Sequence, residues 1–216
     1  MPKLFVTKQP ESSVTKTTIL IGIFAVALSG VAGANDVEKA YEVCAACHGA
    51  NGEGNNDLNA PRIAGMPAWY SVLQLQNFKS GLRGTNAKDQ YGTQMRPMAM
   101  TLTDDAAVDN IAAYVATLEA PKPEATVKGD VEKGKAAYAT CAACHAADGS
   151  GNEALKTPPL AGQADWYVER QLQAYKSGVR GTDPKDGLGM QMRPMAMMLA
   201  TDEAVRDVTA YIATLD

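Results

Sequence analysis

The sequence predicts an all-α protein built from two tandem copies of one helical unit. Positions 97 residues apart, such as Cys44 and Cys141, match along nearly the whole of residues 35–216 without an insertion or deletion. Apolar residues near the end of each copy recur at the spacing of one helix face. No alternating strand pattern competes with that spacing. We therefore expect two similar helical domains in one chain.

The duplication is clearest in residues with distinctive chemistry. The matched pairs include Tyr41 and Tyr138, Pro61 and Pro158, Gly65 and Gly162, Trp69 and Trp166, Gln74 and Gln171, and Tyr114 and Tyr211. Between the copies, residues 119–129 contain Pro121 and Pro123 and are typical of a linker. The predicted domains are therefore residues 35–118 and 130–216.

Each copy contains recognisable helical segments. A short amphipathic segment comes first, at residues 37–43 and 131–140, and a Gly- and Asn-rich loop follows at residues 49–60. The next helix is predicted from Pro67 to Ser80, because proline favours a helix start and Gly81 a helix end. Its counterpart is residues 164–177.

The last helix of each copy is predicted to start near Thr103 or Thr201. Both residues are suitable N-caps, and acidic residues follow them in the first turn. Apolar residues then recur at helical spacing: Ile111, Val115 and Leu118 in the first copy, and Val208, Ile212 and Leu215 in the second. We expect these two apolar faces to belong to the cores.

One mismatch between the copies bears on helix packing. Gly134 in the second copy would allow the first and last helices to approach closely, whereas the matching residue in the first copy is Val37. We therefore expect the first domain to have a looser or shifted helix crossing.

The N-terminus resembles a secretory signal peptide. Three lysines precede a short apolar run at residues 19–28, and Ala32-Gly33-Ala34 is typical of a cleavage site. We predict a signal peptide at residues 1–34, cleaved after Ala34, and hence a periplasmic location. The apolar run is shorter than the roughly 20 residues that span a bilayer, which argues against an uncleaved anchor.

Both histidines of the chain and all four cysteines fall in two Cys-x-x-Cys-His motifs. The motifs are Cys44-Ala-Ala-Cys47-His48 and Cys141-Ala-Ala-Cys144-His145. This pattern is the signature of covalently attached haem, in which the two thiols bind the haem edge and the histidine binds the iron. The sequence therefore predicts two covalently bound haem c groups, with His48 and His145 as axial ligands.

Other uses of these cysteines explain the motifs less well. A structural zinc ion would have to be shared between the copies, because each copy offers only three adjacent ligands. A redox-active Cys-x-x-Cys would be expected in a βαβ context, which the sequence lacks. Disulfides are compatible with an exported chain. None of the three explains the histidine after each second cysteine.

Methionine is the remaining candidate for the sixth iron ligand, unless the site is open. Three methionines in each copy survive the duplication: Met95 and Met192, Met98 and Met195, and Met100 and Met197. Thioether sulfur raises the reduction potential of a haem relative to harder ligands, so such a site suits electron transfer. The residues themselves leave the choice among the three pairs open.

Taken together, these motifs resemble di-haem cytochrome c4, which consists of tandem class I cytochrome c domains. The resemblance rests on the paired haem motifs, on Pro61-Arg62-Ile63-Ala64-Gly65 and Pro158-Pro159-Leu160-Ala161-Gly162, and on the helix that begins Trp-Tyr in each copy. It covers essentially all of residues 35–216. It implies Met95 and Met192 as the axial methionines, and the carbonyl groups of Pro61 and Pro158 as acceptors for the axial histidines.

The resemblance also implies a function. We expect a periplasmic electron carrier without substrate chemistry, in a respiratory chain that leads to a terminal oxidase, and compatible with peripheral membrane association. The net charge of −4 argues against a nucleic-acid partner. The alternatives are an electron-accepting haem subunit of a dehydrogenase, as in a flavocytochrome, and a di-haem peroxidase. Two equivalent Met-rich segments argue against the peroxidase.

Overall fold

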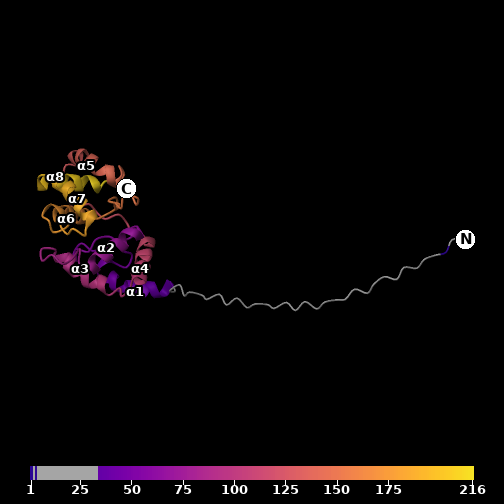
Figure 1. Cartoon of the computed structure of the whole chain (residues 1–216). Helices are drawn as coiled ribbons and strands as arrows, with labels where there is room; N and C mark the ends of the chain where they lie inside the picture. Colours follow the sequence, from indigo (N-terminus) through magenta and orange to yellow (C-terminus); the bar gives the residue numbers. More distant parts are fainter. Residues whose placement is uncertain (2, 4–33) are drawn as a thin grey trace. The chain divides into compact units, whose positions relative to one another are not determined.

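The computed structural model describes residues 1, 3 and 34–216. Residues 4–33, which make up most of the predicted signal peptide, lie outside the described residues. The described part of the chain contains eight α-helices (Figure 1). They are α1 (Ala34–His48), α2 (Ala68–Ser80), α3 (Gln90–Met100), α4 (Asp105–Thr117), α5 (Val131–His145), α6 (Asp165–Lys176), α7 (Gly187–Met197) and α8 (Asp202–Ile212).

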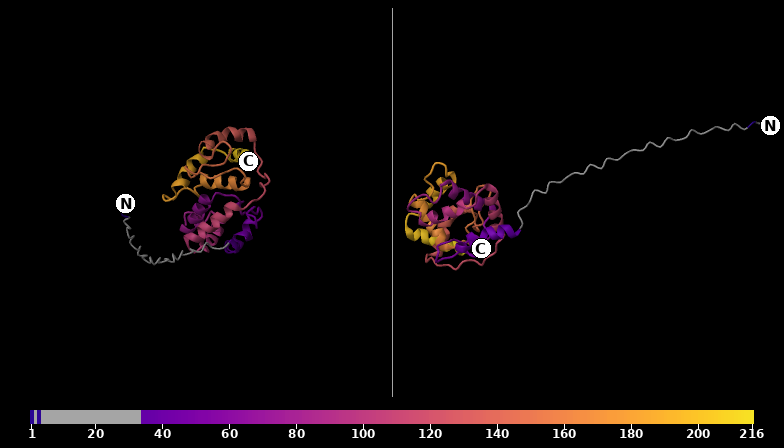
Figure 2. Two further views of the ribbon diagram at one scale, coloured as in Figure 1. Left: turned by 90° about the vertical axis from the view of Figure 1, so that its right-hand side faces the viewer. Right: turned by 90° about the horizontal axis from the view of Figure 1, so that it is seen from below.

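The helices form two bundles of four, α1–α4 and α5–α8, which lie side by side in Figure 1 and in the left view of Figure 2. A hydrogen bond from Gln163 to the carbonyl of Arg62 joins them. Each helix of the second bundle begins 97 residues after its counterpart, as Ala34 and Val131 show. The expected all-α fold with tandem helical domains is therefore confirmed. Residues 119–129, predicted as the linker, contain no helix or strand.

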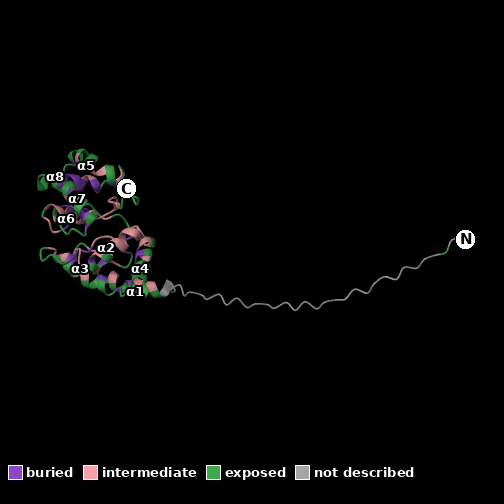
Figure 3. Cartoon of the chain, viewed as in Figure 1, coloured by how far each residue is buried: buried purple, intermediate pink, exposed green. Residues whose placement is uncertain are grey.

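Each bundle has its own apolar core, which lies between its helices (Figure 3). The first core contains Tyr41, Leu102, Val108, Ile111 and Val115. The second contains Tyr138, Val168, Leu172, Ala196, Leu199, Val205, Val208 and Ile212. The apolar stripes predicted on the last helices supply both cores, so burial of these stripes explains why α4 and α8 form where they do.

The first helix of each bundle is longer than the sequence predicted. It continues through the Cys-x-x-Cys-His motif to His48 in α1 and to His145 in α5, instead of ending before the motif. The two cysteines of the motif are three residues apart. Because the motif is helical, both therefore lie on the same side of the helix. A buried tyrosine then fixes the chain after the motif: Tyr41 donates a hydrogen bond to the carbonyl of Gly49, 3.0 Å away.

The second helix follows its predicted start and stop signals. Pro67 precedes α2, and Gly81 ends it in the left-handed conformation with φ of 83°. In the second bundle α6 begins at Asp165 instead of Ala164, which is its N-cap. The predicted extents of both helices are confirmed to within one residue.

The methionine-bearing segments are helical, which the sequence analysis did not predict. Asp89 caps α3 by accepting a hydrogen bond from the backbone of Gly92, and Asp186 caps α7 in the same way. Pro97 and Pro194 lie inside these helices, where proline normally indicates a break. The caps and the packing of α3 and α7 outweigh that local preference.

Of the two predicted N-caps of the last helices, one is confirmed and one is wrong. Thr201 caps α8 as expected, through a hydrogen bond from the backbone of Ala204. In the first bundle the prediction of Thr103 is wrong, because Asp104 caps α4 and accepts from the backbone of Ala107 at 2.8 Å. Aspartate and threonine are both good caps, and the aspartate lies at the position that matches Thr201.

The two bundles differ in how their terminal helices cross. Helices α5 and α8 pack against each other much more extensively than α1 and α4 do. A Cβ atom on Gly134 would overlap the backbone of Asp207 and lie 2.9 Å from Cβ of Tyr211. In the first bundle the side chain of Val37 packs against the core instead. The expectation of a looser crossing in the first domain is confirmed.

The linker is held on the second bundle by a buried aspartate. The Asp165 carboxylate, only 2% exposed, accepts hydrogen bonds from the backbone of Thr126 and Val127 and from the Thr126 hydroxyl. The matching residue of the first bundle is Ala68, so this anchor exists once. Among the described residues, no helix is both long and apolar enough to cross a membrane.

Candidate haem sites

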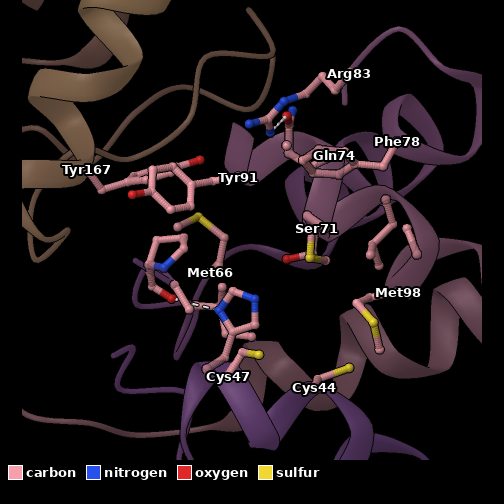
Figure 4. A pocket seen from close by; sticks show the side chains of 18 of the residues that line it. Cys44, Cys47, Met66, Ser71, Gln74, Phe78, Arg83, Tyr91, Met98 and Tyr167 are labelled. Atoms are coloured by element: carbon pink, nitrogen blue, oxygen red, sulfur yellow. Dashed lines mark hydrogen bonds between the residues drawn. The ribbon is translucent and has the colours of Figure 1, made fainter. Parts of the chain in front are cut away.

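A cavity of about 220 Å³ lies in the first bundle, above the C-terminal end of α1 (Figure 4). The wall includes Cys44, Cys47 and His48 from α1, Pro61 from the following loop, Met95 and Met98 from α3, and apolar residues of α2 and α4. The site therefore gathers all the haem-related residues predicted for the first copy. In Figure 4, Cys44 and Cys47 lie on one side of this space, and Tyr91 and Tyr167 lie on the other.

The histidines are held in matching environments. His48 is 7% exposed and its Nδ1 lies 2.8 Å from the carbonyl oxygen of Pro61; His145 is 8% exposed and its Nδ1 lies 2.9 Å from that of Pro158. A carbonyl oxygen only accepts, so Nδ1 must carry the proton in both rings. The Nε2 atom of each neutral ring therefore keeps a free lone pair, as a metal ligand requires.

Burial also favours the neutral form of both rings. It lowers the pKa of His48, and the hydrogen bond to Pro61 opposes this shift only in part. Burial lowers the pKa of His145 in the same way, against the bond to Pro158. A neutral imidazole is the form that binds iron, so burial favours the protonation state that coordination requires.

The cysteines combine a half-buried and an exposed thiol in each motif. Cys44 and Cys141 are half-buried, whereas Cys47 and Cys144 are exposed, and none of the four forms a disulfide. Burial raises the pKa of Cys44 and of Cys141. Among the described residues, no group of three or more Cys, His, Asp or Glu side chains lies close enough together to hold a metal ion.

Two methionines of α3 reach the first cavity. Met95 is half-buried, whereas Met98 is 37% exposed and lies on the Cys44 side of the cavity in Figure 4. In the second bundle Met192 packs against the core, and Met195 is again 37% exposed. The third pair, Met100 and Met197, is more exposed still, at 52% each. Met95 and Met192 are therefore the most enclosed of the three pairs.

Buried arginine side chains suit the carboxylate-bearing edge of a haem. The Nε atoms of five arginines are buried without a hydrogen-bond partner among the described residues: Arg62, Arg83, Arg96, Arg180 and Arg193. Two of them, Arg62 and Arg83, line the first cavity. Unpartnered buried N–H groups are costly unless an acceptor binds them, and the propionate groups of haem supply carboxylate acceptors. The residues present thus fit a haem.

The second bundle contributes to the first cavity, which sequence analysis did not predict. Gln163, Tyr167, Arg170 and Gln171 all line it. The Gln163 side chain donates to the carbonyl of Arg62 at 2.9 Å. The Gln171 side-chain oxygen accepts from Arg180 of its own bundle at 2.5 Å and from Arg83 of the other at 3.4 Å. The sequence does contain a signal for Arg170, because the matching residue in the first copy is the apolar Leu73.

Comparison with known proteins agrees with this geometry. The family model of cytochrome c matches the chain twice, over residues 34–119 and 131–216. A thiosulfate dehydrogenase electron acceptor from Stutzerimonas stutzeri is 34% identical over 91% of this chain and 94% of its own length. Cytochrome c4 from Thiocapsa roseopersicina is 35% identical, over 82% of this chain and 89% of its own.

A solved structure shares the fold as well. The crystal structure of reduced recombinant cytochrome c4 from Pseudomonas stutzeri matches with a TM-score of 0.69 and 27% sequence identity. The match covers 85% of this chain and 99% of that chain. The similarity therefore extends over both bundles and their arrangement in one chain.

Proposed function

The chain belongs to the cytochrome c family, as a di-haem electron carrier of the cytochrome c4 type with two covalent haem c groups, and we propose that it works in the periplasm. There it carries electrons along a respiratory chain towards a terminal oxidase. The observation that supports this most directly is the pair of buried imidazoles, each with Nδ1 bonded to a proline carbonyl and Nε2 left free for iron.

Each side chain of the proposed sites has a distinct role. Cys44, Cys47, Cys141 and Cys144 form the thioether bonds that hold the haems. His48 and His145 are the first axial ligands, and Pro61 and Pro158 fix their ring orientation and raise their basicity. Met95 and Met192 are the second axial ligands, because they are the least exposed of the three methionine pairs. Bound haem iron supplies a reversible one-electron couple.

The protein around each haem favours electron transfer over catalysis. Soft thioether sulfur stabilises the reduced state of both haems, and the apolar walls of the first cavity limit access of water there. A methionine at the sixth position leaves no open site for a substrate, which disfavours a peroxidase. We therefore propose that the chain itself catalyses no chemical reaction and that its partners are redox proteins.

A dehydrogenase is the second candidate partner, on the donor side. The relative from Stutzerimonas stutzeri is named a thiosulfate dehydrogenase electron acceptor, and the alignment covers nine-tenths of both chains. This supports an extension of the proposal in which a thiosulfate-oxidising enzyme delivers electrons to the chain. The haem chemistry is the same in both candidate functions. They differ only in the partner protein that docks on the chain.

Optical spectra of single methionine variants test the proposed ligation. The oxidised protein should show the weak charge-transfer band of methionine-bound ferric haem. Met95→Ala and Met192→Ala should each remove about half of this band, because each affects one haem of two. Met98→Ala is the matched control and should leave the band intact. Loss of half the band in Met98→Ala, or rapid carbon monoxide binding by the unmodified reduced protein, would contradict the proposal.

Reduction kinetics test the donor. The oxidised protein is mixed with a thiosulfate dehydrogenase and thiosulfate, and haem reduction is followed by absorbance. Fast reduction that requires both enzyme and thiosulfate supports the second candidate. Slow reduction in this mixture, together with fast oxidation of the reduced protein by a terminal oxidase, supports the first candidate alone.

A further inference from the structure

Arg170 of α6 breaks the symmetry of the duplication at the interface between the bundles. Its match in the first copy is Leu73, so a charged side chain stands in one domain where the other has an apolar one. Its aromatic partner across the interface, Tyr91, is matched by Leu188. The contact between these two residues therefore exists on one side of the molecule only.

The guanidinium group of Arg170 is fixed by several contacts across the interface. Nη1 donates to Oδ1 of Asn59 at 3.2 Å, and Nη2 donates to the carbonyl oxygen of the same residue at 3.0 Å. The group also lies over the ring of Tyr91 across the interface, 4.4 Å from its centroid, and over that of Trp166 on its own helix, 4.9 Å away. Planar stacking and two directed bonds hold this charge at one place.

The charge of Arg170 is not neutralised by an ion pair. The side chain is half-buried, and among the described residues no carboxylate lies within ion-pair distance of it. The Asp89 carboxylate also lines the first cavity and attracts the Arg170 charge without an ion pair. Asp186 is its counterpart in the second domain and has the same capping role. Both domains therefore contain this carboxylate, whereas the Arg170 position is charged in one domain only.

We propose that Arg170, supplied by the second domain, raises the reduction potential of the first haem. The residue lines the cavity that holds the first haem's proposed ligands. Reduction adds one electron to the iron, and a fixed positive charge beside the site favours the more negative, reduced state. The second haem has no equivalent, because Leu73 is uncharged. The potential of the first haem thus depends on the docking of the second domain.

The inference rests on the proposed placement of one haem in each domain. Quantification of two haems per chain in the denatured protein checks that premise separately. If only one haem is present, the proposed function fails, whatever the effect of Arg170. If two are present and Arg170 has no effect, only the present inference fails.

The test is a redox titration of the intact di-haem protein, with the two haems resolved by their NMR signals. Arg170→Gln should lower the reduction equilibrium constant of the first haem by about tenfold, which corresponds to ~59 mV, and move the second haem far less. Arg206→Gln removes the same charge from an exposed position on α8 and should shift neither haem.

Arg170→Lys separates charge from packing. Lysine keeps the positive charge but loses the planar stacking and the paired hydrogen bonds, so it should retain most of the potential of the first haem. Three results would overturn the inference: no shift in Arg170→Gln, equal shifts of both haems, or a shift in Arg170→Lys as large as that in Arg170→Gln.

Discussion

The backbone of Asp207 on α8 occupies the space into which a side chain on Gly134 of α5 would project. The absence of a Cβ atom is what allows these two helices to pack at close range. The matching residue in the first domain, Val37, carries a branched side chain, and there α1 and α4 pack less extensively.

Gly134→Val should therefore destabilise the second domain. Its side chain cannot be accommodated without moving backbone, so we expect a loss of about 2–4 kcal/mol in the free energy of unfolding. Urea unfolding followed by circular dichroism measures it. The control is Gly187→Ala, a helical glycine whose added Cβ would meet nothing within 4 Å. It should be neutral or stabilising, and equal losses in both variants would contradict the packing argument.

Ala146→Gly should stabilise the same domain. Ala146 ends α5 with φ of 65° and ψ of 159°, a conformation that favours glycine, and the matching residue of the first domain is Gly49. Relief of this strain is worth about 1 kcal/mol. The reverse change, Gly49→Ala, should destabilise the first domain, because φ there is 83° and a Cβ would meet the Glu53 carboxylate. Thermal unfolding of both variants measures these changes in stability. An Ala146→Gly protein that is less stable than the unmodified protein would refute the prediction.

The stability of the second domain should fall in strongly alkaline solution. Burial raises the pKa of Tyr138 from 10.0 to about 12. The unfolded chain releases this proton near pH 10 and the folded chain near pH 12. The stabilisation is therefore complete below pH 10 and is lost as pH rises to 12, by about 2 kcal/mol.

Urea unfolding of the unmodified protein and of Tyr138→Phe between pH 9 and 12 measures this dependence. The variant lacks the hydroxyl that donates to the carbonyl of Ala146 at 2.8 Å, so it should be less stable by about 1 kcal/mol below pH 10. Its stability should change less with pH above that value. Parallel pH profiles for the two proteins would show that Tyr138 does not titrate as described.

Loss of one haem should unfold one domain. In Cys44→Ala/Cys47→Ala the first cavity loses its covalent haem, and a domain of this size has too small an apolar core to compensate. We expect one haem per chain and a marked loss of helical signal. The mirror variant, Cys141→Ala/Cys144→Ala, should affect the second domain instead. Limited proteolysis with mass spectrometry identifies the sensitive domain, and protection of both domains would contradict the prediction.

The haem-binding chemistry of the two sites was predictable because it depends on short motifs with fixed spacing. The spacing within Cys44-Ala-Ala-Cys47-His48 specifies covalent haem wherever the motif folds, and the duplication carries the same chemistry to His145. The stripe of Ile111 and Val115 likewise placed the core on the last helix. Helix α3 was missed because Pro97 indicates a break locally, whereas a cap at Asp89 and tertiary packing sustain the helix.

By itself, the sequence determined the all-α class, the duplication and two covalent haem groups attached through Cys-x-x-Cys-His motifs, since these depend on periodicity and short spacing. Tertiary structure alone decided which side chains from the second domain complete the first cavity. Arg170 and Asn59 are 111 positions apart, and only the docking of the two bundles brings them together. Contacts of that kind depend on shape and burial over the whole interface, which no local pattern encodes.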